Sequence, residues 1–111
     1  MNSKQKGKRG ELELVRKLKE YGFDTERTVQ YNGKAEDGDA DLRGLPNIHI
    51  ECKRVEKLNI YDAISQAKHD AKGGKLPAVF HRKNNCKWLV TMEIDDWMEI
   101  YQEYFQGECG E

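Results

Sequence analysis

The stretch NIHIECKRV, residues 47–55, decides the fold because its apolar and polar side chains alternate. Alternation with a period of two is typical of a β-strand that turns one face toward the core. The apolar face consists of Ile48, Ile50 and Cys52, and the polar face consists of His49, Glu51 and Lys53. Since a strand rises about 3.3 Å per residue, Glu51 and Lys53 are expected to lie about 6.5 Å apart on the same side of this strand.

A second carboxylate precedes this strand. Asp41 opens a short predicted strand, 41–43, which the turn Gly44-Leu45-Pro46 joins to 47–55. Pairing of the two strands would bring Asp41 close to Glu51, with Lys53 beside them. Carboxylates that converge repel one another unless a cation neutralises them or one of them binds a proton. Mg²⁺ takes oxygen ligands and keeps several waters, and a metal-bound water of lowered pKa is a nucleophile for a phosphodiester.

The rest of the chain predicts one α/β domain without repeats or linkers. Asn59 is a natural cap for a second helix, and Gly73-Gly74 is its stop. The expected elements are a helix over 8–21, strands over 27–31, 41–43 and 47–55, a helix after Asn59, strands near 77–82 and 87–92, and a last helix from about Asp95. This order, α-β-β-β-α-β-β-α, predicts a small mixed β-sheet flanked by helices.

The first helix supplies a third acid. Glu11 shares its azimuth with Leu14, Val15 and Leu18, the apolar stripe of that helix, whereas Glu13 projects about 160° away and is predicted to face solvent. A carboxylate on a packing face is costly unless it has a partner, and a metal at Asp41 and Glu51 would be such a partner. The alternative is that Glu11 only interacts favourably with the dipole at the start of the helix.

These residues together resemble the PD-(D/E)xK nuclease superfamily. Asp41-x9-Glu51-Cys52-Lys53 is similar to the D…ExK signature, and KGKRGELELVRKLKEYGF, residues 6–23, resembles the first helix of the archaeal-type Holliday junction resolvases. The likeness covers roughly residues 6–95. It implies a restriction-endonuclease-like core in which Glu11, Asp41 and Glu51 hold the metal and Lys53 takes part in catalysis. The family's second helix often adds a polar residue, for which Gln66 is the best match.

The polar loop before Asp41 departs from the pattern of that family. It holds Glu36, Asp37 and Asp39, and Asp39 would share a face with Asp41 if the strand began earlier. Asp39 is therefore a competing or additional metal ligand. Asp41 is preferred because the match to the family runs through Asp41-Leu42.

Charge is distributed unevenly along the chain. Residues 1–92 carry 19 Lys or Arg against 13 Asp or Glu, a balance of +6, and residues 93–111 carry seven acids and no base, which gives the net charge of −1. A basic body with an acidic C-terminal segment is typical of a nucleic-acid binder, although an ordinary solvated surface would look similar. The predicted phosphate contacts are Lys6, Lys8, Arg9, Arg54 and Lys57.

Segments outside the motif carry further predictions. Residues 1–6 are expected to form a flexible basic arm and 106–111 an acidic tail of the single domain 1–111. No apolar run is long enough for a membrane span or a signal peptide, which predicts a cytosolic protein of a bacterial or phage-infected cell. The stripe of Trp97, Ile100, Tyr101 and Tyr104 is interpreted as core or as a dimer interface. Cys52 is interpreted as a buried small hydrophobe, His81 as a packed histidine, and His49 as a side chain able to approach DNA.

The predicted function is that of an endonuclease that cuts DNA with Mg²⁺, or with Mn²⁺ in its place. The resemblance implies a four-way junction as substrate and a two-fold homodimer as the active form, since a junction presents two strands for symmetric cleavage. A nicking or restriction-like enzyme of the same superfamily remains an alternative, because ExK reports chemistry and not substrate. A DNA-binding module without catalysis is a further alternative, although clustered carboxylates repel phosphate. The plainest reading makes Glu51 and Lys53 a surface ion pair.

Overall fold

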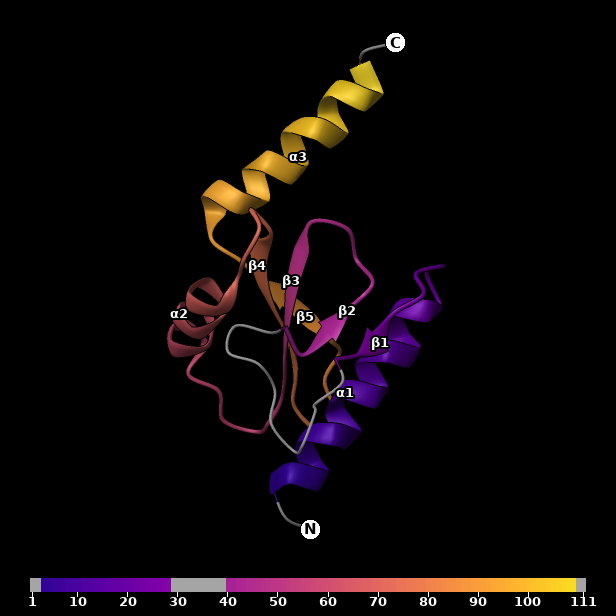
Figure 1. Cartoon of the computed structure of the whole chain (residues 1–111), viewed down its shortest axis with the longest axis vertical. Coiled ribbons are helices and arrows are strands. Elements are labelled where there is room, and N and C mark those ends of the chain that lie inside the picture. Colours follow the sequence, from indigo (N-terminus) through magenta and orange to yellow (C-terminus); the bar gives the residue numbers. More distant parts are fainter. Residues whose placement is uncertain (1–2, 29–39, 110–111) are drawn as a thin grey trace.

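The computed structural model describes residues 3–28 and 40–109 (Figure 1). The order of elements agrees with the prediction from the sequence. The elements are α1 (Ser3–Lys19), β1 (Glu26–Arg27), β2 (Leu42–Arg43), β3 (Ile48–Arg54), α2 (Ile60–Asp70), β4 (Leu76–Arg82), β5 (Leu89–Thr91) and α3 (Ile94–Cys109).

The strands form one mixed five-stranded sheet in the order β1-β2-β3-β4-β5. β3 and β4 run parallel, and the other neighbouring strands run antiparallel. Parallel neighbours need a crossover connection, which α2 provides. The helix starts where the sequence predicts, because Asn59 is its cap and the Asn59 side chain accepts a hydrogen bond from the backbone N–H of Asp62.

The two faces of the sheet are covered by different helices. α1 packs through Leu14 and Val15 against Ile50 and Phe80, in a core that also includes the predicted small hydrophobe Cys52. α2 packs through Ala63, Ile64 and Ala67 against Val79 on the other face. The alternation of NIHIECKRV therefore turns Ile48, Ile50 and Cys52 toward α1 and His49, Glu51 and Lys53 toward the face that α2 covers.

Close approach of α1 to β3 depends on a glycine. A Cβ built at Gly10 would lie 2.5 Å from the Cβ of Arg54, so only glycine allows the helix to come this near to the end of the strand. A second close contact occurs at Gly44, whose φ of +126° and proximity to Thr25 both exclude a larger residue.

Three predictions of element boundaries need correction. α1 begins at Ser3, so residues 3–6 of the predicted flexible arm are helical. Lysine, glutamine and arginine are good helix formers, and they extend the helix past Gly7. β1 is shorter than the predicted strand 27–31, of which residues 29–31 lie outside the described residues, as does the loop 32–38. The predicted acidic tail is helical as far as Cys109.

α3 corrects the prediction that its aromatic stripe belongs to the core. The helix extends away from the sheet, beyond the start of β4, where Figure 1 shows it in orange and yellow, and none of the other described elements packs along it. Its aromatic residues are accordingly exposed, Trp97 by 48% and Tyr104 by 63%. The other interpretation of this stripe, a dimer interface, stays a prediction. Within 3–28 and 40–109, no helix combines the length and the hydropathy needed to cross a membrane.

Candidate active site

Asp41 and Glu51 meet at the junction of β2 and β3. Leu42 pairs with Ile50 in an antiparallel register, with Asp41 directly before Leu42 on one side and Glu51 directly after Ile50 on the other. The Asp41 backbone N–H donates to the carbonyl of Ile50 at 2.9 Å. Its side-chain Oδ2 accepts a hydrogen bond of 2.8 Å from the backbone N–H of Cys52. Asp41 is thus fixed to β3 through both its backbone and its carboxylate.

The surroundings of Asp41 are electrostatically unfavourable for its ionised form. Burial, and after it the negative charge of Glu51, raises the pKa of Asp41 from 3.8 to about 7, and Glu11 adds to this effect. The Cys52 hydrogen bond and the positive charge of Lys53 act in the opposite direction but are outweighed. The four residues singled out in the sequence therefore act on one point of the structure. A surface ion pair of Glu51 with Lys53 does not describe this arrangement, because Glu51 is only 6% exposed.

Glu51 has a buried neighbour on its own strand. His49 is 2% exposed, and its Nε2 lies 3.3 Å from Oε1 of Glu51. The sequence interpretation that gave His49 access to DNA is therefore wrong, because α2 covers this part of the sheet face. Two other residues behave as the sequence indicates. Burial, and to a lesser degree the nearby acids, raises the pKa of the Cys52 thiol, so this thiol stays protonated, and His81 packs against Thr91 with a contact of 2.8 Å.

Glu11 lies on the α1 side of this group and has a cationic partner. Arg27 Nε donates to Oε1 of Glu11 at 2.8 Å. Within the described part of the chain, no three His, Cys, Asp or Glu side chains stand together as a ready-made set of metal ligands. The residues nevertheless fit a hard divalent ion, because Mg²⁺ is commonly held by one or two carboxylates with water and phosphate in its other positions. Asp41 and Glu51 form such a pair, and Glu11 would join them only on leaving Arg27.

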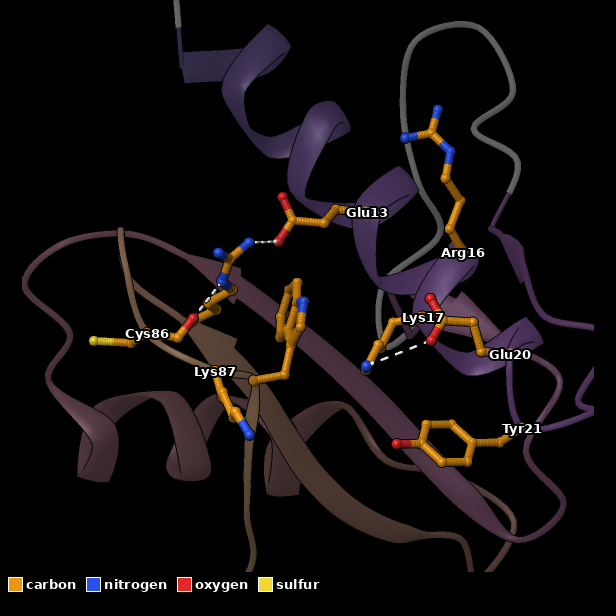
Figure 2. A pocket seen from close by; sticks show the side chains of 9 residues that line it. Glu13, Arg16, Lys17, Glu20, Tyr21, Cys86 and Lys87 are labelled. Carbon is orange, nitrogen blue, oxygen red and sulfur yellow. Dashed lines mark hydrogen bonds and ion pairs between the residues drawn. The ribbon is translucent and has the colours of Figure 1, made fainter.

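The Glu13 side chain is 36% exposed, against 21% for Glu11, as its azimuth predicts, but Glu13 also has partners that the azimuth did not indicate. Its carboxylate accepts a hydrogen bond from Arg82, which Figure 2 draws as a dashed line. It also lies 3.5 Å from Nε of Arg54. The azimuth of a residue describes α1 alone. The long side chains of arginines at the ends of β3 and β4 contact Glu13 from the sheet. The same region forms an open hollow of about 560 Å³ between α1 and the segment before β5, lined in part by Arg16, Lys17 and Lys87.

The predicted DNA contacts fall into two groups. Lys6, Lys8 and Arg9 are exposed on the first half of α1, and Lys57 is exposed beyond β3, which leaves their side chains near solvent. Arg54 instead has a side chain only 17% exposed, held by Glu13, Glu56 and Asn84. In the structure, Arg54 links α1 to the end of β3 through these contacts. The sequence pattern did not indicate this network.

Gln66 and Asp39 remain predictions that the structure does not strengthen. Gln66 is exposed on α2, and its amide donates to Oδ2 of Asp70 at 2.8 Å, one helical turn further along. This bond turns the amide along the surface of the helix instead of toward Glu51. Asp39 lies outside the described residues.

The comparisons with known proteins agree with this geometry. Residues 2–107 match the family described as "Phage putative PDDEXK endonuclease". The chain belongs to this family. A search of the curated proteins gave no significant match. Among solved structures, the fold is similar to that of Hjc, a Holliday junction resolvase of the archaeal hyperthermophile Archaeoglobus fulgidus, with a TM-score of 0.60 and 22% identity over 77% of this chain and 75% of that one.

The D…ExK pattern after which this family is named is present in the sequence of this chain. Asp41, Glu51 and Lys53 match the D…ExK pattern in the sequence, and in the structure the charges of Glu51 and Lys53 act on Asp41. The likeness to Hjc, at this identity, extends to the restriction-endonuclease-like fold. The residue that the sequence reasoning missed is Arg27, the partner of Glu11. A single arginine at the edge of an expected strand gives no signal of such a partnership.

Proposed function

We propose that the protein is a divalent-metal-dependent DNA endonuclease that hydrolyses phosphodiester bonds at branched DNA, with the four-way junction as its preferred substrate. The observation that carries the chemistry is the proximity of Asp41 and Glu51, where burial, and after it the negative charge of Glu51, raises the pKa of Asp41 to about 7. Without a cation, a cluster of carboxylates would weaken the binding of DNA, because carboxylates repel phosphate. A cation between protein and phosphate removes that conflict.

Each residue of the site has a distinct role in this proposal. Asp41 and Glu51 would hold Mg²⁺, or Mn²⁺ in its place, and the bound ion would supply charge to the phosphate oxygen and a water of lowered pKa. The Cys52 N–H keeps the Asp41 carboxylate in position. Lys53, on the same side of β3, would offset negative charge that develops on the phosphate during attack. Lys6, Lys8, Arg9 and Lys57 would bind the DNA backbone without reading its sequence.

The proposed substrate and the proposed assembly follow from the fold. Similarity in fold to a Holliday junction resolvase favours branched DNA. A four-way junction presents two strands for symmetric cleavage, which favours a two-fold homodimer. A restriction-like or nicking enzyme of the same superfamily would share the acid cluster and differ in its substrate.

The test compares a labelled four-way junction with a linear duplex of the same sequence, each with Mg²⁺, with Mn²⁺ and with EDTA. The expected result is metal-dependent cleavage of the junction at paired positions and little cleavage of the duplex. Equal cleavage of both substrates would retain the nuclease and overturn the junction preference. Binding without cleavage under all three conditions would favour a DNA-binding module and overturn the proposed chemistry.

A further inference from the structure

α3 carries an apolar face that the rest of the described chain leaves uncovered. At about 100° per residue, six large side chains fall within an arc of about 120° on this helix. They are Ile94, Trp97, Met98, Tyr101, Tyr104 and Phe105, with exposed fractions from 36% to 73%. The acids Asp95, Asp96, Glu99 and Glu103 lie outside that arc. An apolar stripe of this width on an otherwise acidic helix is typical of a helix that packs against a protein surface.

The apolar face is also ordered among its own side chains. The rings of Trp97 and Tyr101 stack with centroids 5.1 Å apart and an interplanar angle of 10°. Tyr101 and Tyr104 follow at 6.2 Å. The result is a continuous aromatic ridge along one side of α3. A ridge of rigid aromatic side chains loses little conformational entropy when it becomes buried, which suits it to an interface.

A groove lies directly beside the root of this ridge. It has a volume of about 450 Å³ and is lined mainly by Ile60, Tyr61 and Ile64 of α2 and by Met92 and Ile94. Tyr61 is 84% exposed at its rim. Because Ile94 belongs both to the groove and to the apolar face of α3, the two form one continuous surface with a convex part and a concave part.

We propose that α3 is a dimerisation arm whose apolar face packs into this groove on a second copy of the chain. A two-fold interface uses the same surface on both partners, so that surface must be complementary to itself. A ridge beside a groove meets this condition, since each ridge enters the other copy's groove. The segment 93–111 carries −7 and the remainder of each chain carries +6, so the arm of one copy meets a body of opposite net charge, with Glu93 and Asp95 as the acids within the groove itself.

The available area is sufficient for a stable dimer. Large apolar side chains bury on the order of 150–250 Å² each, so six that are about half exposed offer on the order of 600 Å² per arm. Two arms, together with the surfaces that they cover, would bury on the order of 2,000 Å², which lies in the range of stable protein interfaces. The inference goes beyond the proposed cleavage chemistry, because it concerns residues that take no part in the acid cluster.

The test measures the oligomeric state of the full chain by sedimentation equilibrium over a micromolar dilution series. The wild-type chain is expected to dimerise, and Tyr104→Glu should weaken the dimer by on the order of 30-fold or more, as for a residue central to an interface. Gln106→Glu introduces the same charge two residues away, outside the apolar arc, and should dimerise like the wild type. Tyr61→Glu tests the groove and should weaken the dimer as Tyr104→Glu does. Circular dichroism checks that each variant keeps its helices.

Each other outcome overturns a stated part of the proposal. A wild-type chain that stays monomeric throughout removes the second copy as occupant and leaves the arm to a different protein. A dimer that survives Tyr61→Glu but not Tyr104→Glu would mean that the arms pair with each other and not with the grooves. Equal weakening by Gln106→Glu would exclude the apolar face as the cause. Asp41→Asn, which the proposed chemistry requires to be inactive, should dimerise like the wild type, so the two proposals can fail separately.

Discussion

Two charged clusters lie against β3, and they are balanced differently. On the α1 side, Glu13 meets two arginines, Arg54 and Arg82. At the β2 edge of the strand, Asp41 is exposed to the negative charge of Glu51 with Lys53 nearby, and the pKa of Asp41 is raised to about 7. The first cluster joins a helix to two strands with its charges compensated. The second holds an excess of negative charge in a buried place, which is a cost that a purely structural role would not require.

The two clusters show how an acid of the proposed metal site differs from a structural acid in this fold. Glu11 and Glu13 are two residues apart on α1, and each has an arginine partner, Arg27 for Glu11 and Arg82 for Glu13. The difference lies in what else they reach, because Glu11 acts electrostatically on Asp41 and raises its pKa. A cluster of buried charges that compensate one another loses stability when one partner is removed. A cluster with excess negative charge is stabilised by a bound cation.

The largest expected effect comes from removing either carboxylate of the unbalanced cluster. Asp41→Asn and Glu51→Gln should each lower cleavage of a labelled four-way junction by on the order of 10³-fold or more, because several kcal/mol of charge stabilisation depend on the metal. Binding of the junction, measured by gel shift in EDTA, should be unchanged or tighter, since repulsion toward phosphate falls. Glu99→Gln, an exposed acid on α3, serves as the control with unchanged activity. Cleavage within a few-fold of wild type in either mutant would contradict the metal assignment.

Lys53→Ala is expected to have the next largest effect. If its ammonium offsets charge in the transition state, single-turnover cleavage should slow by roughly 10²-fold, comparable to the loss of one oxyanion donor. Lys57→Ala, beyond the end of the same strand and exposed, should change the affinity for DNA and its salt dependence more than the rate. A weaker affinity with an unchanged rate in Lys53→Ala would make Lys53 a phosphate contact as well.

A smaller effect separates the two glutamates of α1. Glu11→Gln should lower the cleavage rate by about 10-fold, the direction expected for a group close to the metal, and should raise the Mg²⁺ concentration needed for half-maximal rate. Glu13→Gln should leave that concentration unchanged. It should instead lower the free energy of unfolding by roughly 1–3 kcal/mol, because two partly buried arginines lose their shared acceptor. Titration of activity with Mg²⁺ and urea unfolding measure the two quantities.

Two further variants control for this pair. Glu20→Gln removes an exposed acid of the same type at the end of α1, whose contact with Lys17 is at 3.5 Å, and should change neither quantity. Arg27→Gln frees Glu11 and should leave the Mg²⁺ requirement equal or lower. If Arg27→Gln raised the Mg²⁺ concentration needed for half-maximal rate, Glu11 would act through its ion pair with Arg27 and not through the metal.

Much of the fold followed from local patterns in the sequence. The alternation in 47–55 fixed the two faces of β3, and Asn59 fixed the start of α2, because both signals act within a few residues. The predicted start of α1 at residue 8 was wrong, because the lysines and the glutamine before it are good helix formers and the helix begins at Ser3. α3 was predicted as a helix, but its position was not, since an amphipathic stripe has the same pattern whether its own chain or another one covers it.

The acid cluster was predictable for the same reason, whereas the arginine partners were not. Asp41 directly precedes β2, and Glu51 and Lys53 lie on β3, so the short turn between the two strands is enough to bring them near one another. Arg27 and Arg82 reach acids 16 and 69 residues away, through contacts that depend on how α1 lies on the sheet. The burial of His49 likewise depends on α2 covering that face.

The smallest expected effect tests the unbalanced charge directly, without DNA. A carboxyl whose pKa rises from 3.8 to about 7 on folding stabilises the folded chain below the lower value, and this contribution is lost as the pH rises through about 7. The amide introduced by Asp41→Asn cannot ionise but keeps an oxygen that accepts the Cys52 N–H. In EDTA, this variant should therefore gain in Tm over wild type between about pH 5 and about pH 8, by on the order of several degrees. Mg²⁺ at the higher pH should raise the Tm of the wild type but not of the variant, whereas Asp24→Asn, an exposed acid, should behave like the wild type. A Tm difference that does not change with pH would mean that Asp41 is already compensated, and the contrast between the two charged clusters would disappear.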